Sequence, residues 1–465
     1  MSNPAPTVDT GQNNARPMGE HVRATIVLGV PLVAAQIAQM LITVIDTVML
    51  GWLGVAELAA GTLAGQLFFL FIIFGLGFAA AMIPLVAGAL GKGDEREVRR
   101  SARMGLWALV ALSIAFMVPL WFTRDILLVL GQEVELVDLA ERYMRIAQWS
   151  LIPAFVLIGL RGFLTALEWA GAVLAITIFA TVLNAALNYA FIFGNWGAPR
   201  LEMEGAAVAT VLANLAAAVL AAIVVAVSKK TRGYSVFTRF WRPDWAALST
   251  ISRLGFPISL TILAEAGLFS AASIMIGWLG KEPLAAHGIA LQIASLAFMV
   301  PLGLSQVASV RVGNAVGRSA WMDVALATRA VIWLAVGFAV ISGVVFIAIP
   351  EVLSALFLDA DDPNAPTVLQ LTVPLLYMAA AFQIVDGLQA VGSGALRGLK
   401  DTKVPMIMAT IAYWPVGLSA AYFFAYPMGY GATGVWAGLV AGLAVASVCM
   451  IGRFILRTRY GLTPA

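Results

Sequence analysis

The chain has 465 residues, of which 61% are hydrophobic and only 11% are charged, and its mean hydropathy is +0.92. Soluble globular proteins carry about 25% charged residues, so this composition excludes a water-soluble protein and predicts one that crosses a membrane many times. The single cysteine, Cys449, excludes an intrachain disulfide, and two histidines, His21 and His287, leave little material for a His-based metal site. The net charge of +3 says little about partners, and we find no nucleotide-binding loop or nucleic-acid module.

Residues 1–24 are predicted to be a disordered cytoplasmic tail, because this end is polar, rich in Pro and Asn, and lacks the apolar stretch of a signal peptide. After the tail we expect an all-α fold, since apolar segments long enough to span a membrane recur along the chain. The twelve expected spans are 26–50, 58–87, 104–122, 139–163, 172–194, 205–227, 255–279, 284–310, 324–349, 367–396, 404–426 and 432–452.

The basic residues are divided unevenly between the two sides of this expected bundle. When the N-terminus and every even-to-odd connection are assigned to one side, that side holds all but five of the 28 Lys and Arg residues. The five exceptions are Arg124, Arg142, Arg145, Arg200 and Lys281. Because cytoplasmic loops carry an excess of Lys and Arg, both termini are predicted to be cytoplasmic, and no basic residue is left for the membrane interior.

The chain also repeats itself at an offset of 226 residues. The matches include Gly51-Trp52-Leu53-Gly54 with Gly277-Trp278-Leu279-Gly280, Gln66 with Gln292, and Gly77 with Gly303; Arg161-Gly162 matches Arg397-Gly398 at an offset of 236. Each half has an even number of spans, so both halves enter the membrane from one side, as in a parallel repeat. We therefore expect an N-lobe at 25–227, a C-lobe at 255–455 and a cytoplasmic tail at 456–465.

A cytoplasmic linker is expected between the lobes at 228–254. It contains six basic residues and the aromatic residues Phe237, Phe240, Trp241 and Trp245. This composition fits a segment that lies on the membrane surface, and it fits a solvated basic loop equally well.

Three acidic residues lie inside long apolar stretches with no Lys or Arg within one helical turn: Asp46, Glu265 and Asp386. A charge near the bilayer centre costs roughly 2.5–3.5 kcal/mol, and a buried carboxylate without a basic partner takes up a proton or a metal cation. The repeat places a neutral residue opposite each acid, which argues against a shared scaffolding role. In the same order, these neutral residues are Ala272, Gln39 and Ser150. We predict that the three acids are ion-coupling groups of a transporter.

Other polar side chains share the predicted depth of Asp46 in the N-lobe. Asn184 and Asn188 lie one turn apart on one helix face, and Thr210 lies near the start of the next span. A carboxylate with amide and hydroxyl oxygens suits a small hard cation or a hydrogen-bonded protonation site. The alternative is a structural hydrogen-bond cluster between helices.

In the C-lobe, Glu265 and Asp386 are predicted near the middle of two spans, with Phe382 and Gln383 one turn before Asp386 on the same face. Two carboxylates that face one cavity repel each other. Protonation or cation binding would relieve this repulsion, and the hypothesis is that the entering ion expels an organic cation.

Several aromatic residues are candidates to line a substrate cavity and to stack on flat cationic drugs. The candidates are Phe269, Phe298, Phe382 and Trp414, with Gln39 and Gln383 as polar neighbours. Packing in the core or against lipid is the alternative for each aromatic ring. His287, near the end of a span, is expected at the membrane interface.

Four short segments resemble the MATE (multidrug and toxic compound extrusion) family, in its NorM-type branch. They are Asp46-Thr47-Val48-Met49-Leu50-Gly51, Asn188-Tyr189 with Phe193-Gly194, Gly205-Ala206-Ala207-Val208-Ala209-Thr210, and Gly394-Ala395-Leu396-Arg397-Gly398. The resemblance covers about residues 25–455 and implies two six-helix lobes around a V-shaped cavity. It also implies a bacterial inner-membrane antiporter that exchanges cationic amphipathic drugs for Na⁺ or H⁺. We expect a monomer that needs no cofactor besides the coupling ion.

The resemblance assigns roles to the candidate residues. Asp46, Asn184, Asn188 and Thr210 would form an N-lobe cation site, and Glu265 and Asp386 would be the carboxylates typical of the branch. Phe298 and Phe382 stand where sodium-coupled members can carry an aromatic residue, sometimes Tyr. Because Phe lacks the hydroxyl, the choice between Na⁺ and H⁺ stays open.

Three other functions were weighed. An exporter of a metabolite or lipid-linked substrate with a related flippase-type fold is expected to have Arg or Lys in its cavity for phosphate, and the charge assignment leaves none there. An intramembrane enzyme needs a nucleophile–base pair or a metal cluster, which only the acid pair could supply. A channel would not concentrate its substrate against a gradient. We therefore expect a transporter and no enzymatic activity.

Overall fold

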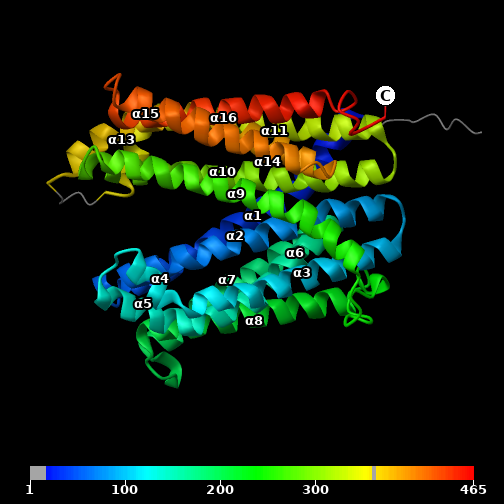
Figure 1. The fold of residues 1–465 in the computed structure, drawn as a ribbon, viewed down its shortest axis with the longest axis horizontal. Coiled ribbons are helices and arrows are strands. Elements are labelled where there is room, and N and C mark those ends of the chain that lie inside the picture. The colour runs from blue at the N-terminus through cyan, green and yellow to red at the C-terminus, as the bar shows by residue number, and fades with distance from the viewer. Residues whose placement is uncertain (1–16, 359–362, 465) are drawn as a thin grey trace, which may run out of the picture.

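The computed structural model describes residues 17–358 and 363–464, and these are helical almost throughout (Figure 1). Twelve segments are long and apolar enough to cross a membrane, which confirms the prediction of an all-α fold with twelve spans. The chain is a multi-pass membrane protein.

The first six spans pack together as one group and the last six as another, which we call the N-lobe and the C-lobe. The helices of the N-lobe are α1 (Met18–Gly51), α2 (Val55–Gly91), α3 (Glu95–Trp121), α4 (Thr123–Val129), α5 (Val134–Ala147), η1 (Gln148–Ser150), α6 (Leu151–Ala166), α7 (Ala170–Phe193), η2 (Asn195–Gly197) and α8 (Glu202–Val227). A short turn, η3 (Arg232–Tyr234), lies in the linker. The helices of the C-lobe are α9 (Trp245–Gly277), α10 (Lys281–Gly317), α11 (Trp321–Ala348), α12 (Pro350–Ala355), α13 (Ala365–Gly398), α14 (Lys403–Ile411), η4 (Ala412–Leu418), α15 (Ser419–Ala425) and α16 (Gly431–Ile455).

Two predicted boundaries are wrong because helices continue into polar sequence. Helix α1 begins at Met18, so the tail expected at 1–24 is helical from residue 18, and residues 1–16 lie outside the described part. Helix α9 begins at Trp245, so the linker ends ten residues before the predicted 254. The start of α9 is set by Asp244, whose side chain accepts a hydrogen bond from the backbone N–H of Ala247, a helix cap that does not depend on hydropathy.

Two of the spans are not single α-helices. The fourth span is broken by η1 between α5 and α6, and the eleventh contains a π-helical turn, η4, between α14 and α15. Pro415 lies inside this turn, where its missing N–H cannot support the ordinary helical hydrogen bond. The turn holds Tyr413 fully buried and leaves Trp414 41% exposed, so it orients two neighbouring aromatic side chains differently.

The seam between the lobes is built from glycines that allow close backbone contact. A Cβ atom added to Gly77 would lie 2.6 Å from the backbone nitrogen of Ser259, and one added to Gly303 would lie 3.1 Å from that of Val33. At the offset of the repeat, Gly77 corresponds to Gly303 and Val33 corresponds to Ser259. The contact of Gly77 with Ser259 is therefore equivalent to the contact of Gly303 with Val33. The seam therefore has the symmetry expected of a parallel repeat.

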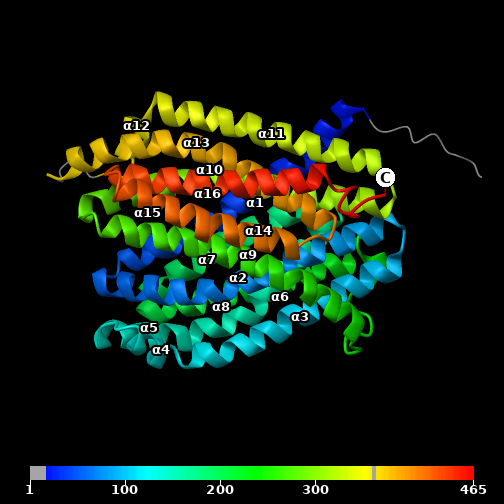
Figure 2. The ribbon, with the colours of Figure 1, turned by 45° about the horizontal axis from the view of Figure 1, so that its top comes forward.

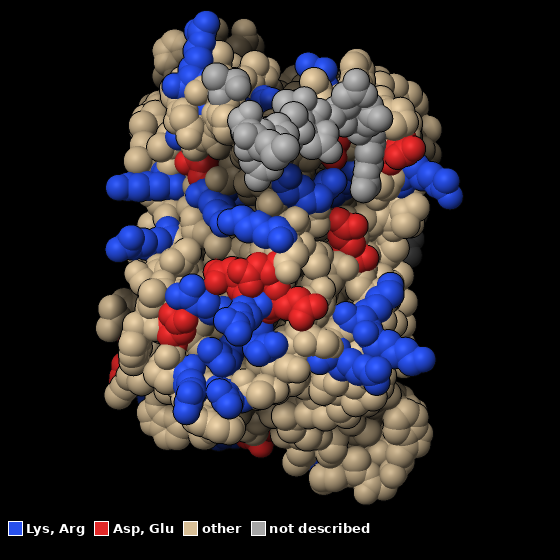
Figure 3. All heavy atoms as spheres, turned by 90° about the vertical axis from the view of Figure 1, so that its right-hand side faces the viewer, with Lys and Arg blue, Asp and Glu red and all other residues tan. Residues whose placement is uncertain are grey.

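Helix α1 begins and α16 ends at the same end of the bundle, which we call the basic end (Figures 1 and 2). Lys and Arg side chains gather on this face (Figure 3). The close inter-lobe contacts of Gly91 with Asn314 and of Gly317 with Gly88 lie at this end, whereas the helices of the two lobes diverge toward the other end (Figure 1). The lobes are thus closed against each other at the basic end.

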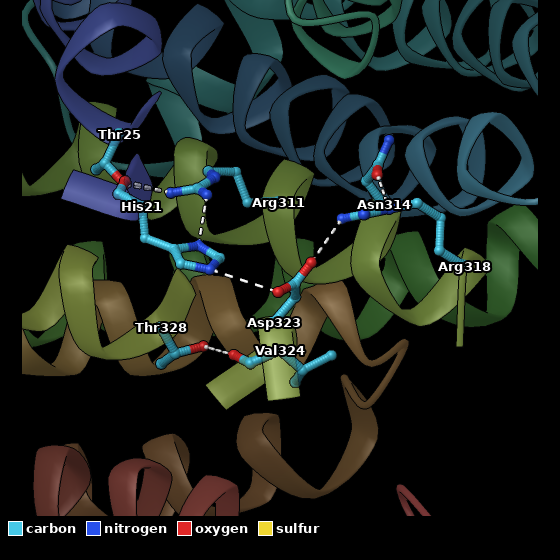
Figure 4. A network of polar contacts seen from close by, with 8 residues as sticks. All are labelled: His21, Thr25, Arg311, Asn314, Arg318, Asp323, Val324 and Thr328. Carbon is cyan, nitrogen blue, oxygen red and sulfur yellow. Dashed lines mark hydrogen bonds and ion pairs between the residues drawn. The ribbon is translucent and has the colours of Figure 1, made fainter. Parts of the chain in front are cut away.

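A buried polar network strengthens this closure by joining α1 to α10 and α11 (Figure 4). Arg311 donates hydrogen bonds to the backbone oxygen of His21 and to Oγ1 of Thr25, both at 2.6 Å, and its Nη2 lies 2.7 Å from Nδ1 of His21. Nε2 of His21 lies 3.5 Å from Oδ1 of Asp323, whose Oδ2 accepts a hydrogen bond from Arg318 at 3.2 Å. Because His21 belongs to the N-lobe and the other charged groups to the C-lobe, the lobes cannot separate here without breaking these contacts.

The linker packs along the basic end of α3. Arg99 donates a hydrogen bond to the backbone oxygen of Tyr234 at 2.7 Å, and Trp107 donates one to that of Phe240 at 2.7 Å. Asp244 forms an ion pair with Arg100, and this pair, with the N–H of Ala247, lowers the pKa of Asp244 to about 2. The linker is therefore held against α3 by these contacts, while much of it, including Trp241, stays exposed.

Asp323→Asn should weaken the closure of the basic end, because it removes the charge that holds His21 and Arg318. We expect a shift of about 1–2 kcal/mol toward separation of the lobes there. Spin labels at Val55 and Lys281, exposed residues at the starts of α2 and α10, would report it as a shorter inter-label distance in a Cys449→Ala background. The matched control is Asp401→Asn, which breaks an ion pair with Arg453 inside the C-lobe; an equal change in both variants would contradict an inter-lobe role.

Asp244→Asn should lower thermal stability at pH 7 by less than about 1 kcal/mol, because the pair is partly exposed and Asn still caps a helix. The pKa of Asp244 is lower in the folded chain than its ordinary 3.8, so its contribution is complete above about pH 4 and is lost as the pH falls toward 2. Melting of detergent-purified protein should therefore show a larger difference between wild type and variant at pH 7 than at pH 3. Equal differences at both pH values would contradict the ion pair.

Candidate functional site

The structure brings together the predicted acidic and amide residues of the N-lobe. Asn188 of α7 donates hydrogen bonds to Oδ1 of Asp46 on α1 at 2.5 Å and to Oδ1 of Asn184 at 3.3 Å. Both asparagines are buried, and Asp46 is half-buried. Oδ1 of Asn188 is buried without a hydrogen-bond partner among the described residues, so the cluster holds an unused oxygen beside a carboxylate. Such a donor set suits a small hard cation or a shared proton.

Thr210 of α8 belongs to the same cluster through a residue that the sequence analysis missed. Tyr143 of α5 lies against Thr210 and interacts electrostatically with Asp46. Thr210 itself donates a hydrogen bond to the backbone oxygen of Ala206 at 2.9 Å, so its oxygen can still accept one. Tyr143 was not predicted because it lies among charged residues at the start of the fourth span. Its expected depth, which is close to that of Asp46, is the feature from which it could have been predicted.

Glu265 of α9 and Asp386 of α13 lie near enough in the C-lobe for an electrostatic interaction. Asp386 is 3% exposed, and its Oδ1 has no hydrogen-bond partner among the described residues. Gln383 donates a hydrogen bond to the backbone oxygen of Ala294 at 2.9 Å, and its own Oε1 is also buried without a partner. Tyr413, another residue missed from the sequence, lies close enough to interact with both carboxylates. The oxygens Oδ1 of Asp386 and Oε1 of Gln383 are therefore available to a cation or a proton.

Two basic residues reach the interior, so the prediction that none would do so is wrong. Arg161 of α6 donates a hydrogen bond to Oε1 of Gln39 on α1 at 2.6 Å. Arg397 of α13 donates one to Oγ of Ser305 at 2.5 Å and interacts electrostatically with Glu265. Both arginines lie near the C-terminal ends of helices that finish at the basic end, and helical side chains point back toward the N-terminus, which here means toward the middle of the bundle.

The predicted cavity residues have different environments. Phe382 is 3% exposed and packs with ring centroids 5.9 Å from Phe269 and 5.7 Å from Trp436, and the neighbouring Gln383 is fully buried. These rings form part of the C-lobe core. Trp414 and Gln39 are exposed, and Phe298 is half-buried, so these three side chains remain accessible to a ligand. Trp414 is oriented by its hydrogen bond to the backbone oxygen of Ala264 at 3.2 Å.

His287 is buried among helices of the C-lobe, an environment that its sequence position did not indicate. It is 1% exposed, 3.0 Å from Oγ of Ser273, and accepts a hydrogen bond from Trp436 at 3.1 Å. The contact of His287 with Trp436 could not be predicted from the sequence, because Trp436 belongs to a distant span.

The model of the MatE family matches residues 31–190 and 257–423 of the chain. The chain belongs to the MatE family. The starts of the two matches differ by the offset of the internal repeat, so each lobe is one copy of the family unit. Two curated relatives are described as "Probable multidrug resistance protein NorM". The protein from Rhizobium meliloti (strain 1021) is 48% identical over 446 residues, or 96% of each chain, and that from Agrobacterium fabrum is 46% identical over 437 residues, or 94% of each.

Solved structures share the fold. A chain reported as an outward-facing conformation of a multidrug resistance MATE family transporter matches with a TM-score of 0.85 and 21% identity, over 97% of this chain and 100% of that one. The eukaryotic MATE transporter AtDTX14 matches with a TM-score of 0.84 and 18% identity, over 96% and 100%. The prediction of a MATE-type fold and of the NorM-type family is confirmed, and the chain is a multidrug transporter by family.

Asp386→Asn should leave stability unchanged or raise it by about 1 kcal/mol, because an amide removes the repulsion from Glu265 and makes its own hydrogen bonds. Asp46→Asn is the matched variant; it should lower stability by a similar amount, since Asp46 already accepts a hydrogen bond from Asn188. Thermal unfolding in detergent measures both. A clear loss of stability in Asp386→Asn would show that the carboxylate has a fixed donor and is not waiting for an ion.

Proposed function

We propose that this MatE-family transporter is a secondary active antiporter in a bacterial inner membrane, exporting cationic amphipathic drugs in exchange for Na⁺ or H⁺. The observation that carries the proposal is the buried, unbonded Oδ1 of Asp386 beside Glu265. Acidic residues inside spans are costly, and an unsatisfied pair of them is stable only when a mobile cation or proton completes it.

The closed basic end supports a direction of transport. The excess of Lys and Arg at this end supports a cytoplasmic orientation for it. The lobes then diverge toward the outside, where an incoming ion reaches the acids from the higher concentration. An ion that binds more tightly when the lobes are arranged one way shifts the equilibrium toward that arrangement and drives release of the drug.

A second candidate function is export of an anionic or lipid-linked substrate. Arg161 and Arg397 remove the argument that the interior has no group for a phosphate. Drug export is still favoured, because the acids retain unused oxygens for a cation, whereas Arg397 donates a hydrogen bond to Ser305 and lies near an acid that disfavours an anion. The relatives described as probable multidrug resistance proteins point the same way.

Ethidium counterflow into proteoliposomes, with Na⁺ and H⁺ gradients imposed separately, tests the antiport. We expect stimulation by one gradient only, and this result identifies the coupling ion. Glu265→Gln and Asp386→Asn should each lower gradient-driven transport by about tenfold or more, the value of one charge-assisted contact. Glu351→Gln, a surface acid at the end away from the basic end, is the control. Unchanged transport in both interior variants would refute the mechanism.

A further inference from the structure

The two interior arginines occupy equivalent places in the two lobes. Arg161 and Arg397 match in the repeat, and so do their partners on the first span of each lobe, Gln39 and Glu265. In the N-lobe the arginine contacts an amide oxygen at 2.6 Å, and in the C-lobe it interacts with a carboxylate. The same two positions therefore hold an arginine with a nearby acid in the C-lobe and an arginine with a neutral amide in the N-lobe.

The contact between Arg161 and Gln39 joins two helices of the N-lobe that do not pack on each other, and the equivalent positions in the C-lobe are related in the same way. Helix α6 packs mainly on α2, α3 and α8, and α13 mainly on α10, α11 and α16, so neither arginine helix packs directly on the helix that holds its partner. The long guanidinium side chain fills this separation. Gln39 is exposed and Arg161 half-buried, so the contact between them is accessible to a ligand.

Arg161 lacks a carboxylate partner among the described residues. Its positive charge remains, because an arginine side chain does not lose its proton in a protein. A neutral amide oxygen compensates a buried cation only in part. The guanidinium has further N–H groups besides the one that Gln39 accepts, and the side-chain NH₂ of Gln39 is a donor beside them. Together they present several donors and one positive charge, which is the recognition pattern for a carboxylate.

We propose that Arg161 and Gln39 form an anion-binding subsite that takes the carboxylate of zwitterionic amphiphilic substrates. The proposal rests on the proposed drug export and adds to it a preference for drugs that carry an acid as well as an amine. Glu265 disfavours an anion at the equivalent place in the C-lobe, because its own negative charge already lies near Arg397. The interior acids remain available for the amine of the same substrate class.

Equilibrium binding to the purified, detergent-solubilised protein tests this with two matched ligands. Norfloxacin carries a carboxylate and a protonated amine at neutral pH, and its ethyl ester retains only the amine. Wild type should bind norfloxacin about tenfold more tightly than the ester, as expected for one charge-assisted contact. Gln39→Glu, which gives Arg161 the partner that Arg397 has, should abolish this preference, and Arg161→Gln should do the same by removing the cation.

Gln66→Glu is the matched control, since it adds the same charge to an exposed position on α2 of the same lobe. It should retain the preference for norfloxacin. Loss of the preference in Gln66→Glu would assign it to the overall field of the lobe, and retention in Gln39→Glu would exclude the subsite. If one variant misfolds, as judged by its melting temperature, the other still decides.

Ethidium transport by wild type separates this inference from the proposed function. Absence of ethidium transport would refute the exporter, whereas the ratio of the two binding constants would still report on Arg161. Equal binding of norfloxacin and its ester by a wild-type protein that transports ethidium would refute the subsite alone.

Discussion

The cost of charge inside an apolar bundle governs how this transporter is built. Asp386 and Glu265 repel each other in a region where few groups can compensate them. The chain keeps Oδ1 of Asp386 and Oε1 of Gln383 without fixed partners, although ordinary folding would favour satisfying both. One turn before Asp386, Phe382 is 3% exposed and packs against Trp436 in the C-lobe core.

A rigid seam with a small area of very close contact allows two lobes to change their arrangement. The glycine contacts at Gly77 and Gly303 bring backbones together without interlocking side chains, so the surfaces can separate without repacking a core. The network of His21, Arg311 and Asp323 then adds a polar contact that is specific to the closed arrangement. Packing and electrostatics thus have separate roles, because the seam permits movement and the network selects a state.

The sequence was sufficient for the span number, the parallel repeat and the grouping of Asp46 with Asn184 and Asn188, because each depends on local composition or helical spacing. It was insufficient where contacts link distant spans. Arg161 and Arg397 were assigned to a surface because their positions near helix ends were visible, while the direction of their side chains was not.

Tyr143, Tyr413 and Trp436 illustrate the same limit. Each is one of many aromatic residues, and only the fold shows which of them meets Thr210, the C-lobe acids or His287. The helix start at Asp244 was missed for another reason. A capping residue acts through a hydrogen bond to the backbone. A helix start predicted from the length of an apolar segment does not take this hydrogen bond into account.

The lobes share one backbone plan and differ in charge. The N-lobe carries Asp46 with its amide partners and, separately, Arg161 bound to a neutral amide. The C-lobe carries two acids and Arg397, which interacts with one of them. An ion favours one arrangement of the lobes only when it binds that arrangement more tightly than the other. Because Gln39 and Glu265 differ at one equivalent position, the same helical framework presents a positive subsite in one lobe and a negative one in the other.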